Sequence, residues 1–298
     1  MSQNTTNLSI KSFLQRMYWV IPTLVALFIT IIKEIFKKNV LNRTSPIQFL
    51  IVFYVAMFLY AQVTIDRIVI PTIQEFGLIL LASFCYFFAN LLGLKVLKDI
   101  RISVFKPVSG LSAVFVVLFA MLFLQETLTR TQGFGIILAL LPIVYISMIE
   151  YYEKELDVKH AAYLLIAFVF EAAAVMFDRI VLRTVNVYTY FYFMKALLII
   201  YFICIMYAFY SERITKSYLK TQSVWIGLLA FITTIGSYAY FFAMSNPLAH
   251  PGVVKVIISS EIIFTTLVGG LYFKEKHIVF KGAIAACSLV GIVVLIFA

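Results

Sequence analysis

Two lysines and one glutamate lie inside apolar stretches of the sequence, where a charge is costly. Lys106 and Lys255 lie near the starts of two such stretches, and Glu261 lies further inside the second one. In a membrane helix Glu261 would lie roughly 12 Å along the axis, where an ionised carboxylate costs at least about 2.5 kcal/mol unless it is paired, protonated or in contact with water. Charges kept at such a cost are candidates for binding a solute or carrying a proton.

Each of these residues has two interpretations. The lysines could hold an anionic or carboxylate-bearing solute, or their side chains could extend to the membrane surface. Glu261 could carry a proton or contact a substrate amine, or it could form a static ion pair with Lys195 or another cation. The sequence leaves both interpretations open.

Other polar side chains within apolar stretches could belong to the same site. Glu171 and Lys195 lie at comparable depths in two stretches, so they could compensate each other as a buried ion pair or line the site. Asn90, Tyr238 and Tyr240 could line a cavity, although amide and aromatic side chains more often serve packing or interhelical hydrogen bonds.

Four charged residues near the ends of apolar stretches are expected to have structural roles. Asp178 and Arg179 lie near the end of one stretch, where we expect them at the membrane interface. Glu126 and Glu275 end their stretches beside cationic connectors. There they would cap a connector or act as a gate by ion pairing.

The composition indicates that the surroundings of these side chains are a lipid bilayer. Hydrophobic residues make up 63% of the 298 residues, charged residues make up 13%, and the mean hydropathy is +1.01. Soluble domains carry about 45–50% apolar and about 25% charged residues. Because water cannot solvate such a surface, we predict an all-α, multi-pass integral membrane protein, located in the cell membrane.

The apolar stretches predict about ten transmembrane helices, since a bilayer needs roughly 20 apolar residues per helix. The polar residues 1–16 would form an N-terminal tail, and the polar connector 151–158 would separate a first set of five helices, 17–150, from a second set, 159–298. The predicted helices are 17–36, 46–64, 73–95, 103–124, 130–149, 159–182, 187–210, 223–245, 253–273 and 278–297.

The two sets of helices match each other in sequence. Residues 104–126 overlay residues 253–275 without a gap, and this overlay places Lys106 on Lys255. Because each copy has an odd number of helices, the copies would lie in opposite orientations in the membrane. We therefore predict two inverted five-helix repeats that enclose a central cavity.

A second, weaker match lies earlier in each set. Residues 36–41, Phe-Lys-Lys-Asn-Val-Leu, overlay residues 177–182, Phe-Asp-Arg-Ile-Val-Leu. Apolar residues often agree by chance in such chains, so the match between the two sets of helices rests mainly on the aligned lysines and glutamates.

A motif runs from the fourth predicted helix into the fifth. It consists of Pro107 followed by Val108 near the start of the helix, Glu126 at its end, and Gln132 followed by Gly133 in the next helix. With this motif the chain resembles the EamA-type branch of the drug/metabolite transporter superfamily, whose members are ten-helix proteins made of two such repeats. The resemblance implies a secondary transporter.

The second half keeps only part of this motif. Glu275 and Gly282 are present, whereas Val256 and Lys281 replace the proline and the glutamine. The chain also has a narrower similarity to the triose-phosphate and nucleotide-sugar translocator branch. That similarity implies that lysines at the positions of Lys106 and Lys255 hold substrate phosphate.

The predicted function is a secondary transporter that moves a small organic metabolite by alternating access, with an amino acid or an anionic or phosphorylated solute as cargo. A channel and a non-transporting sensor or scaffold are the alternatives. An integral-membrane enzyme fits less well, because the histidines lie in separate connectors without metal-ligand or triad spacing: His160, His250 and His277. We expect a monomer or homodimer in the lipid bilayer, with no cofactor, no metal and no nucleic acid.

The orientation in the membrane follows from two arguments that disagree. Leaving Lys195 aside, the N-terminus and the even-numbered connectors hold seven lysines and arginines, and the odd-numbered connectors hold sixteen. Because cations mark the cytoplasmic side, this count places both termini outside the cytoplasm. The family resemblance implies that they lie inside.

Overall fold

The computed structural model of the chain is built of helices and connectors. It describes residues 2–41, 44–65, 68–100, 105, 108–152, 157–210, 214–265 and 289–297, and this part contains no strand. The first half comprises α1 (Ser2–Leu41), α2 (Pro46–Thr64), α3 (Ile73–Asp99), α5 (Ser112–Phe123) and α6 (Arg130–Tyr152). The second half comprises α7 (Val158–Val181), α8 (Val187–Phe209), α9 (Lys216–Ser245), α10 (Pro251–Ser259) and a helical stretch at 289–297.

Side-chain caps explain where several helices begin. Thr72 and Glu75 form a capping box at the start of α3, in which each side chain binds the other residue's backbone amide. Asp157, Asn186 and Thr215 each accept a hydrogen bond from an amide of the first turn of α7, α8 and α9. These caps satisfy amides that a helix cannot satisfy internally.

Two helices begin earlier than their apolar stretches predict. α1 begins at Ser2 instead of residue 17, because the sequence contains no glycine or proline before Pro22 that would break the helix. α9 begins at Lys216 instead of residue 223, directly after its cap Thr215. Polar residues can therefore continue a membrane helix beyond its apolar part.

The helices of the first half pack mainly against helices of the second half. The most extensive contacts join α3 to α7 and α1 to α9, followed by α2 to α8 and α9, α3 to α8, α5 to α7 and α10, and α1 to α10. If α1, α2, α3 and α5 are exchanged with α7, α8, α9 and α10, this pattern of contacts maps onto itself. The two sets of helices are thus equivalent in what they contact.

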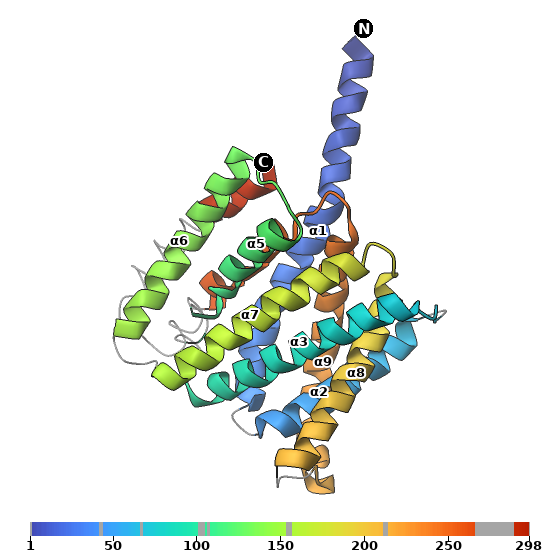
Figure 1. Ribbon diagram of the computed structural model, residues 1–298, viewed down its shortest axis with the longest axis vertical. Coiled ribbons are helices and arrows are strands. Elements are labelled where there is room, and N and C mark those ends of the chain that lie inside the picture. Colours follow the sequence, from blue (N-terminus) through green and yellow to red (C-terminus); the bar gives the residue numbers. More distant parts are fainter. Residues whose placement is uncertain are drawn as a thin grey trace.

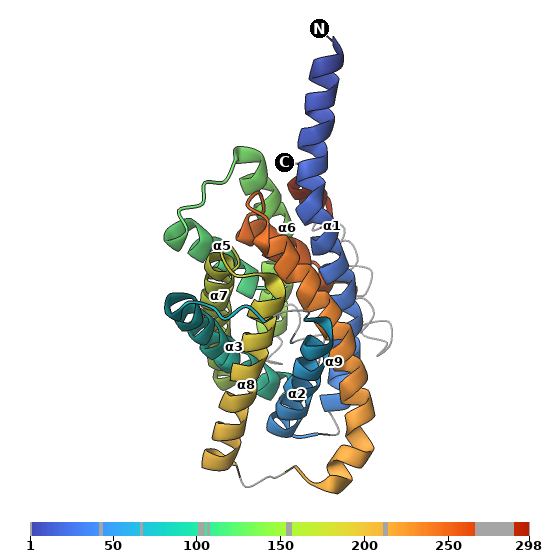
Figure 2. The same ribbon diagram turned by 90° about the vertical axis from the view of Figure 1, so that its right-hand side faces the viewer.

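The directions of α1 and α7, whose ends match in the sequence, can be followed in Figure 1. In Figure 1, α1 runs downward from the N-terminus at the top, whereas α7 runs upward from the lower left. Figure 2 shows α2, α8 and α9 next to one another in the lower part of the molecule, as their contacts require.

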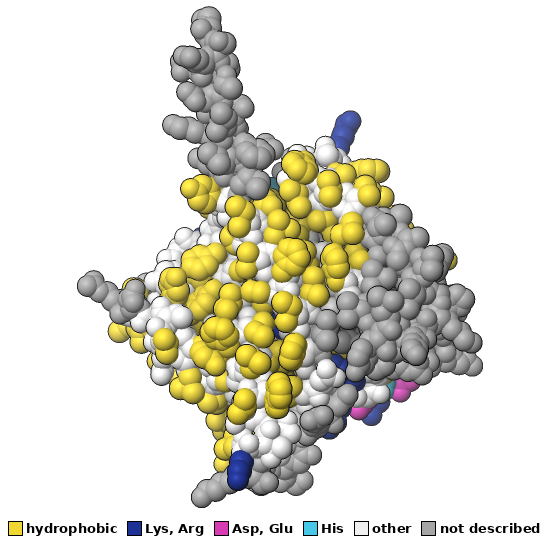
Figure 3. Space-filling view, turned by 180° about the vertical axis from the view of Figure 1, so that it is seen from behind, with side chains coloured by type: hydrophobic (Ala, Val, Ile, Leu, Met, Phe, Trp, Pro, Cys, Tyr) yellow, Lys and Arg dark blue, Asp and Glu magenta, His cyan; other side chains and the backbone are white. Residues whose placement is uncertain are grey.

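Within the described part of the chain, five helices are long and apolar enough to cross a membrane, judged by length and composition: Tyr18–Leu41, Pro46–Thr64, Ile73–Asp99, Val187–Phe209 and Tyr218–Ser245. One face of the molecule is largely covered by hydrophobic side chains where it is described, with lysine and arginine toward its edges (Figure 3). Lipid explains so large an exposed apolar surface. The prediction of ten spans also covers residues 266–288, which lie outside the described residues, and it stays a prediction.

Glycine allows α6 and the stretch 289–297 to approach closely. A Cβ added at Gly291 would lie 2.5 Å from the backbone nitrogen of Ala139 and 2.8 Å from the carbonyl oxygen of Gly135. We expect Gly291→Ala to lower the free energy of unfolding by about 1–3 kcal/mol, because the two backbones must separate. Gly227→Ala is the control, since nothing lies within 4 Å of a Cβ at Gly227. Equal thermal stability of the two variants in detergent would contradict this packing.

Candidate functional site

A central cavity of about 330 Å³ lies between the two halves. Its walls are formed by α1, α2, α3, α5 with the residues before it, α7, α8, α9, α10 and the short stretch that follows α10. The volume is at the lower end of the range for small-molecule sites, about 300–1,000 Å³. The cavity can therefore hold a small organic molecule.

The charges that line the cavity are nearly balanced. The carboxylates are Glu34, Glu171 and Glu261, and the ammonium groups are Lys33, Lys37, Lys195 and Lys255. The Nζ atoms of Lys37 and Lys33 lie 3.0 Å and 3.9 Å from Oε1 of Glu34 on the same helix. A solute in this cavity would meet both signs of charge.

Glu171 pairs with Lys255, whereas the sequence left open whether Glu171 and Lys195 compensate each other or line the site. The Lys255 Nζ atom lies 2.5 Å from Oε1 of Glu171, which joins α10 to α7. The side chains are 16% and 31% exposed, so the ion pair remains accessible from the cavity. Two residues at equal depth in different helices need not lie on faces that meet, so the sequence alone did not identify Lys255 as the partner of Glu171.

Lys195 lies against aromatic rings. Its Nζ atom lies 4.8 Å from the ring centroid of Phe191 and 5.2 Å from that of Tyr54, both within the range of cation–π attraction. It is also close enough to Asp178 to interact electrostatically. Lys195 lines the cavity but is only 6% exposed, so the protein itself supplies much of its stabilisation.

Glu261 lies deep in the protein, as its position in the sequence predicts. It begins the short helical stretch 261–265 that continues from α10, it is 6% exposed, and it lines the cavity. Lys106 lies outside the described residues, and so does Glu275. The structure therefore places only one of the two predicted symmetric lysines, Lys255.

Asn90 and Tyr240 line the cavity, whereas Tyr238 does not. The Tyr238 hydroxyl hydrogen-bonds Thr64 at 2.6 Å, and its ring packs on Phe191 with the centroids 4.5 Å apart. Side chains two residues apart on a helix point in directions that differ by about 200° around its axis. Tyr238 and Tyr240 therefore cannot face the same side. Tyr238 is a packing residue, in contrast to the prediction.

Asp178 and Arg179 are inside the protein, which corrects the expectation that they lie at the interface. They are 0% and 3% exposed. The Asp178 carboxylate accepts hydrogen bonds from the hydroxyl groups of Tyr86, Tyr190 and Tyr240, which come from α3, α8 and α9. Nothing in the sequence indicates that tyrosines from three helices meet, so this cluster was not predicted.

Arg179 caps the C-terminal end of α9. Its guanidinium group donates to the carbonyl oxygens of Met244, Asn246 and Pro247, the last two at 2.7 Å and 3.0 Å. Met244 is in the last turn of α9, and Asn246 and Pro247 follow its end, where a cation also complements the helix dipole.

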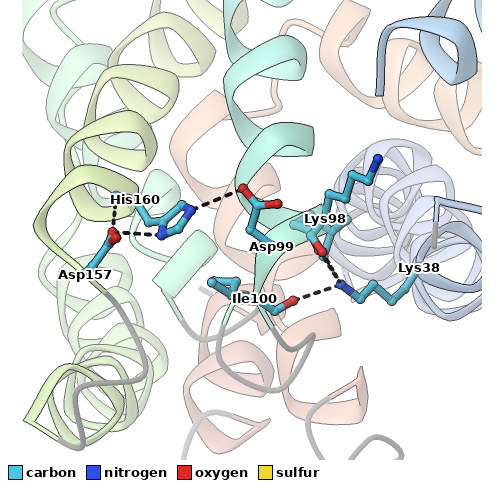
Figure 4. A network of polar contacts seen from close by, with 7 residues as sticks. Lys38, Lys98, Asp99, Ile100, Asp157 and His160 are labelled. Carbon is cyan, nitrogen blue, oxygen red and sulfur yellow. Dashed lines mark hydrogen bonds and ion pairs between the residues drawn. The ribbon is translucent and has the colours of Figure 1, made fainter. Parts of the chain in front are cut away.

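Lys38 caps α3 in the same way (Figure 4). Its ammonium group donates to the carbonyl oxygens of Leu97, Lys98 and Ile100, the last at 2.8 Å. The sequence match of residues 36–41 with 177–182 places Lys38 on Arg179. Equivalent residues of the two halves therefore make equivalent contacts.

Further polar contacts join helix ends. His160 contacts Asp99 at 3.3 Å and Asp157 at 2.7 Å, which joins the start of α7 to the end of α3 (Figure 4). The backbone amide of His160 holds the pKa of Asp157 below its ordinary value. Glu126, which was predicted to form an ion pair or a cap, lies 3.6 Å from Nδ1 of His250 at the start of α10.

Comparison with known proteins relates the chain to membrane transport. The EamA-like transporter family matches residues 17–148, which are the first five predicted helices. A solved crystal structure has a similar fold, with a TM-score of 0.69 and 14% sequence identity over 93% of this chain and 95% of that chain. The comparison with curated proteins gives no match. The family match and the apolar helices define an integral, multi-pass membrane protein and support the resemblance to EamA-type transporters.

Proposed function

We propose that the protein is a secondary transporter that carries a small polar organic solute through the central cavity by alternating access. The observation that carries this proposal is the position of the cavity, which takes its walls from helices of both halves. If the two halves rock against each other, a site between them opens to one side and then to the other.

The equivalence of the two halves supports this mechanism. The contacts between helices map onto themselves when the halves are exchanged, and Lys38 and Arg179 cap equivalent helices. In Figure 1 the capped end of α3 lies lower than the capped end of α9. An inverted duplication accounts for both facts, because it offers two arrangements of similar energy that face opposite sides.

The charges of the cavity favour a solute with both a carboxylate and an amine. The lysines can bind a carboxylate, and the three glutamates can bind an ammonium group. An amino acid or a similar zwitterionic metabolite fits this balance. A phosphorylated solute, which the similarity to the triose-phosphate branch implies, depends on Lys106 and stays a prediction.

Uptake into vesicles tests this function. Purified protein in proteoliposomes is expected to take up at least one labelled amino acid with saturable kinetics. Glu261→Gln is expected to reduce that uptake at least about tenfold, because one charge-assisted contact is worth about 1.5–3 kcal/mol. Thr234→Val, in α9 but away from the cavity, should retain uptake. The proposal fails if folded protein gives no saturable uptake of amino acids, organic acids or phosphorylated metabolites.

A further inference from the structure

The tyrosine-bound carboxylate of Asp178 lies one layer of side chains behind the central cavity. Asp178 itself is 0% exposed, but two of its three hydrogen-bond donors, Tyr86 and Tyr240, also line the cavity. Both donate to Oδ2, whereas Tyr190, which is not among the residues that line the cavity, donates to Oδ1. The two cavity-lining hydroxyl groups thus connect the carboxylate to any water or solute in the cavity.

We propose that Asp178 is a proton-binding site, and that its protonation turns the Tyr240 hydroxyl group toward the cavity. This inference rests on the proposed transport function and assigns its proton-coupling residue. A proton from water in the cavity forms an O–H bond at Oδ2, and the corresponding O–H bond of the hydronium ion breaks. No electrons are transferred and no co-reactant is needed.

The hydrogen-bond geometry explains why Tyr240 turns. While Asp178 is ionised it accepts three O–H donors, but a protonated Oδ2 must itself donate to an oxygen. The Tyr240 contact is 3.3 Å, longer than the 2.5 Å contact of Tyr86, so it is the easier one to reverse. Tyr240 then accepts from Asp178, and its own O–H group becomes a donor for a solute in the cavity.

The charged and titratable groups around Asp178 allow such a change. Cys85 faces it from α3 beside Tyr86, and Lys195 faces it from α8 beside Tyr190. On the neighbouring α10, Lys255 pairs with Glu171 instead. Lys195 is a nearby positive charge that stabilises the ionised form without contacting it directly, so that both protonation states of Asp178 can be accommodated.

The repeat argues against a purely structural role for this cluster. The match of residues 36–41 with 177–182 places Lys37 at the position of Asp178 in the first half. Position 37 thus carries a lysine, paired with Glu34, where α7 carries the carboxylate of Asp178. The caps formed by Lys38 and Arg179 are common to both halves, whereas the carboxylate that accepts from the tyrosines lies on α7 and is replaced by Lys37 at the matching position of α1. An asymmetric feature beside the cavity is the kind expected for a specific function.

Infrared spectroscopy of the purified full-length protein tests the proposal without a solute. Across a pH series, the C=O band of a protonated carboxyl group is expected to titrate in the unmodified protein and in Glu261→Gln, and that titration is expected to be absent in Asp178→Asn. Tyr240→Phe should move its midpoint to higher pH, because the ionised form loses a donor. Tyr238→Phe, two residues away and without contact to Asp178, should leave the midpoint unchanged.

Two outcomes would overturn the assignment. One is a titrating band that persists in Asp178→Asn, and the other is a band that Glu261→Gln removes instead. If Asp178→Asn does not fold, the titration midpoints of Tyr240→Phe and Tyr238→Phe are compared instead. Equal midpoints in these two variants would exclude the proposed contact between Tyr240 and Asp178. A vesicle assay without uptake would refute transport while leaving the infrared result intact, so failures of the two proposals are distinguishable.

Discussion

Replacing Arg179 by alanine is expected to lower the free energy of unfolding by about 3–5 kcal/mol, because three backbone carbonyls at and just after the end of α9 would lose a charged donor in a buried or partly buried place. Arg179 is 3% exposed, so water can replace the guanidinium group only poorly. The measurement is a denaturation titration in mixed micelles, followed by helix content.

The equivalent cap in the first half provides the matched control. Lys38 also donates to three carbonyls, but it is only partly buried, so Lys38→Ala is expected to cost about 1 kcal/mol. Arg179→Lys should recover part of the loss, since a lysine can reach fewer of the carbonyls. If Arg179→Ala and Lys38→Ala cost the same, burial does not determine the strength of these caps.

Reversing the ion pair between Glu171 and Lys255 is expected to separate its structural role from its role in binding. Either single change, Glu171→Lys or Lys255→Glu, places like charges together and should destabilise the protein by about 2–4 kcal/mol. The double variant restores opposite charges on α7 and α10, so most of that stability should return.

Transport is expected to respond differently from stability. If a solute carboxylate displaces Glu171 from Lys255, the double variant presents a carboxylate where the solute needs an ammonium group. Uptake should then stay at least about tenfold reduced, which corresponds to about 1.4 kcal/mol, although the protein is stable. Thermal stability in detergent and uptake into proteoliposomes are the paired measurements. Full recovery of uptake together with stability would mean that the pair is only structural.

Helix positions were predictable wherever local signals mark them. The prediction of 46–64 agrees with α2, which follows Ser45 and begins at Pro46, and the prediction of 187–210 agrees with α8 to within one residue. Proline in the first turn and a capping Asn186 are signals that depend only on neighbouring residues. The membrane class was predictable for the same reason, because composition requires no knowledge of the fold.

Partners across helices were not predictable from the sequence. In a membrane protein both lipid-facing and buried positions are apolar, so the pattern along a helix does not determine which side faces the centre. This explains why the sequence left the partner of Glu171 open, why it offered Tyr238 as a candidate for the cavity, and why the hydroxyl groups around Asp178 were missed. The equivalence of Lys38 and Arg179 was visible in the repeat, but its meaning required the contacts.

Labelling of a cysteine in the cavity from each side of the membrane tests alternating access most directly. In the parent protein, serine replaces the natural cysteines, Cys85, Cys204 and Cys287. Two variants of this parent are compared: Ser237→Cys is in the cavity wall, and Thr234→Cys is on the same helix but away from the cavity. An impermeant thiol reagent is applied to vesicles of either orientation. We predict that the cysteine at position 237 is modified from both sides and that the cysteine at position 234 is modified from neither. Modification of position 237 from one side only would contradict the central claim.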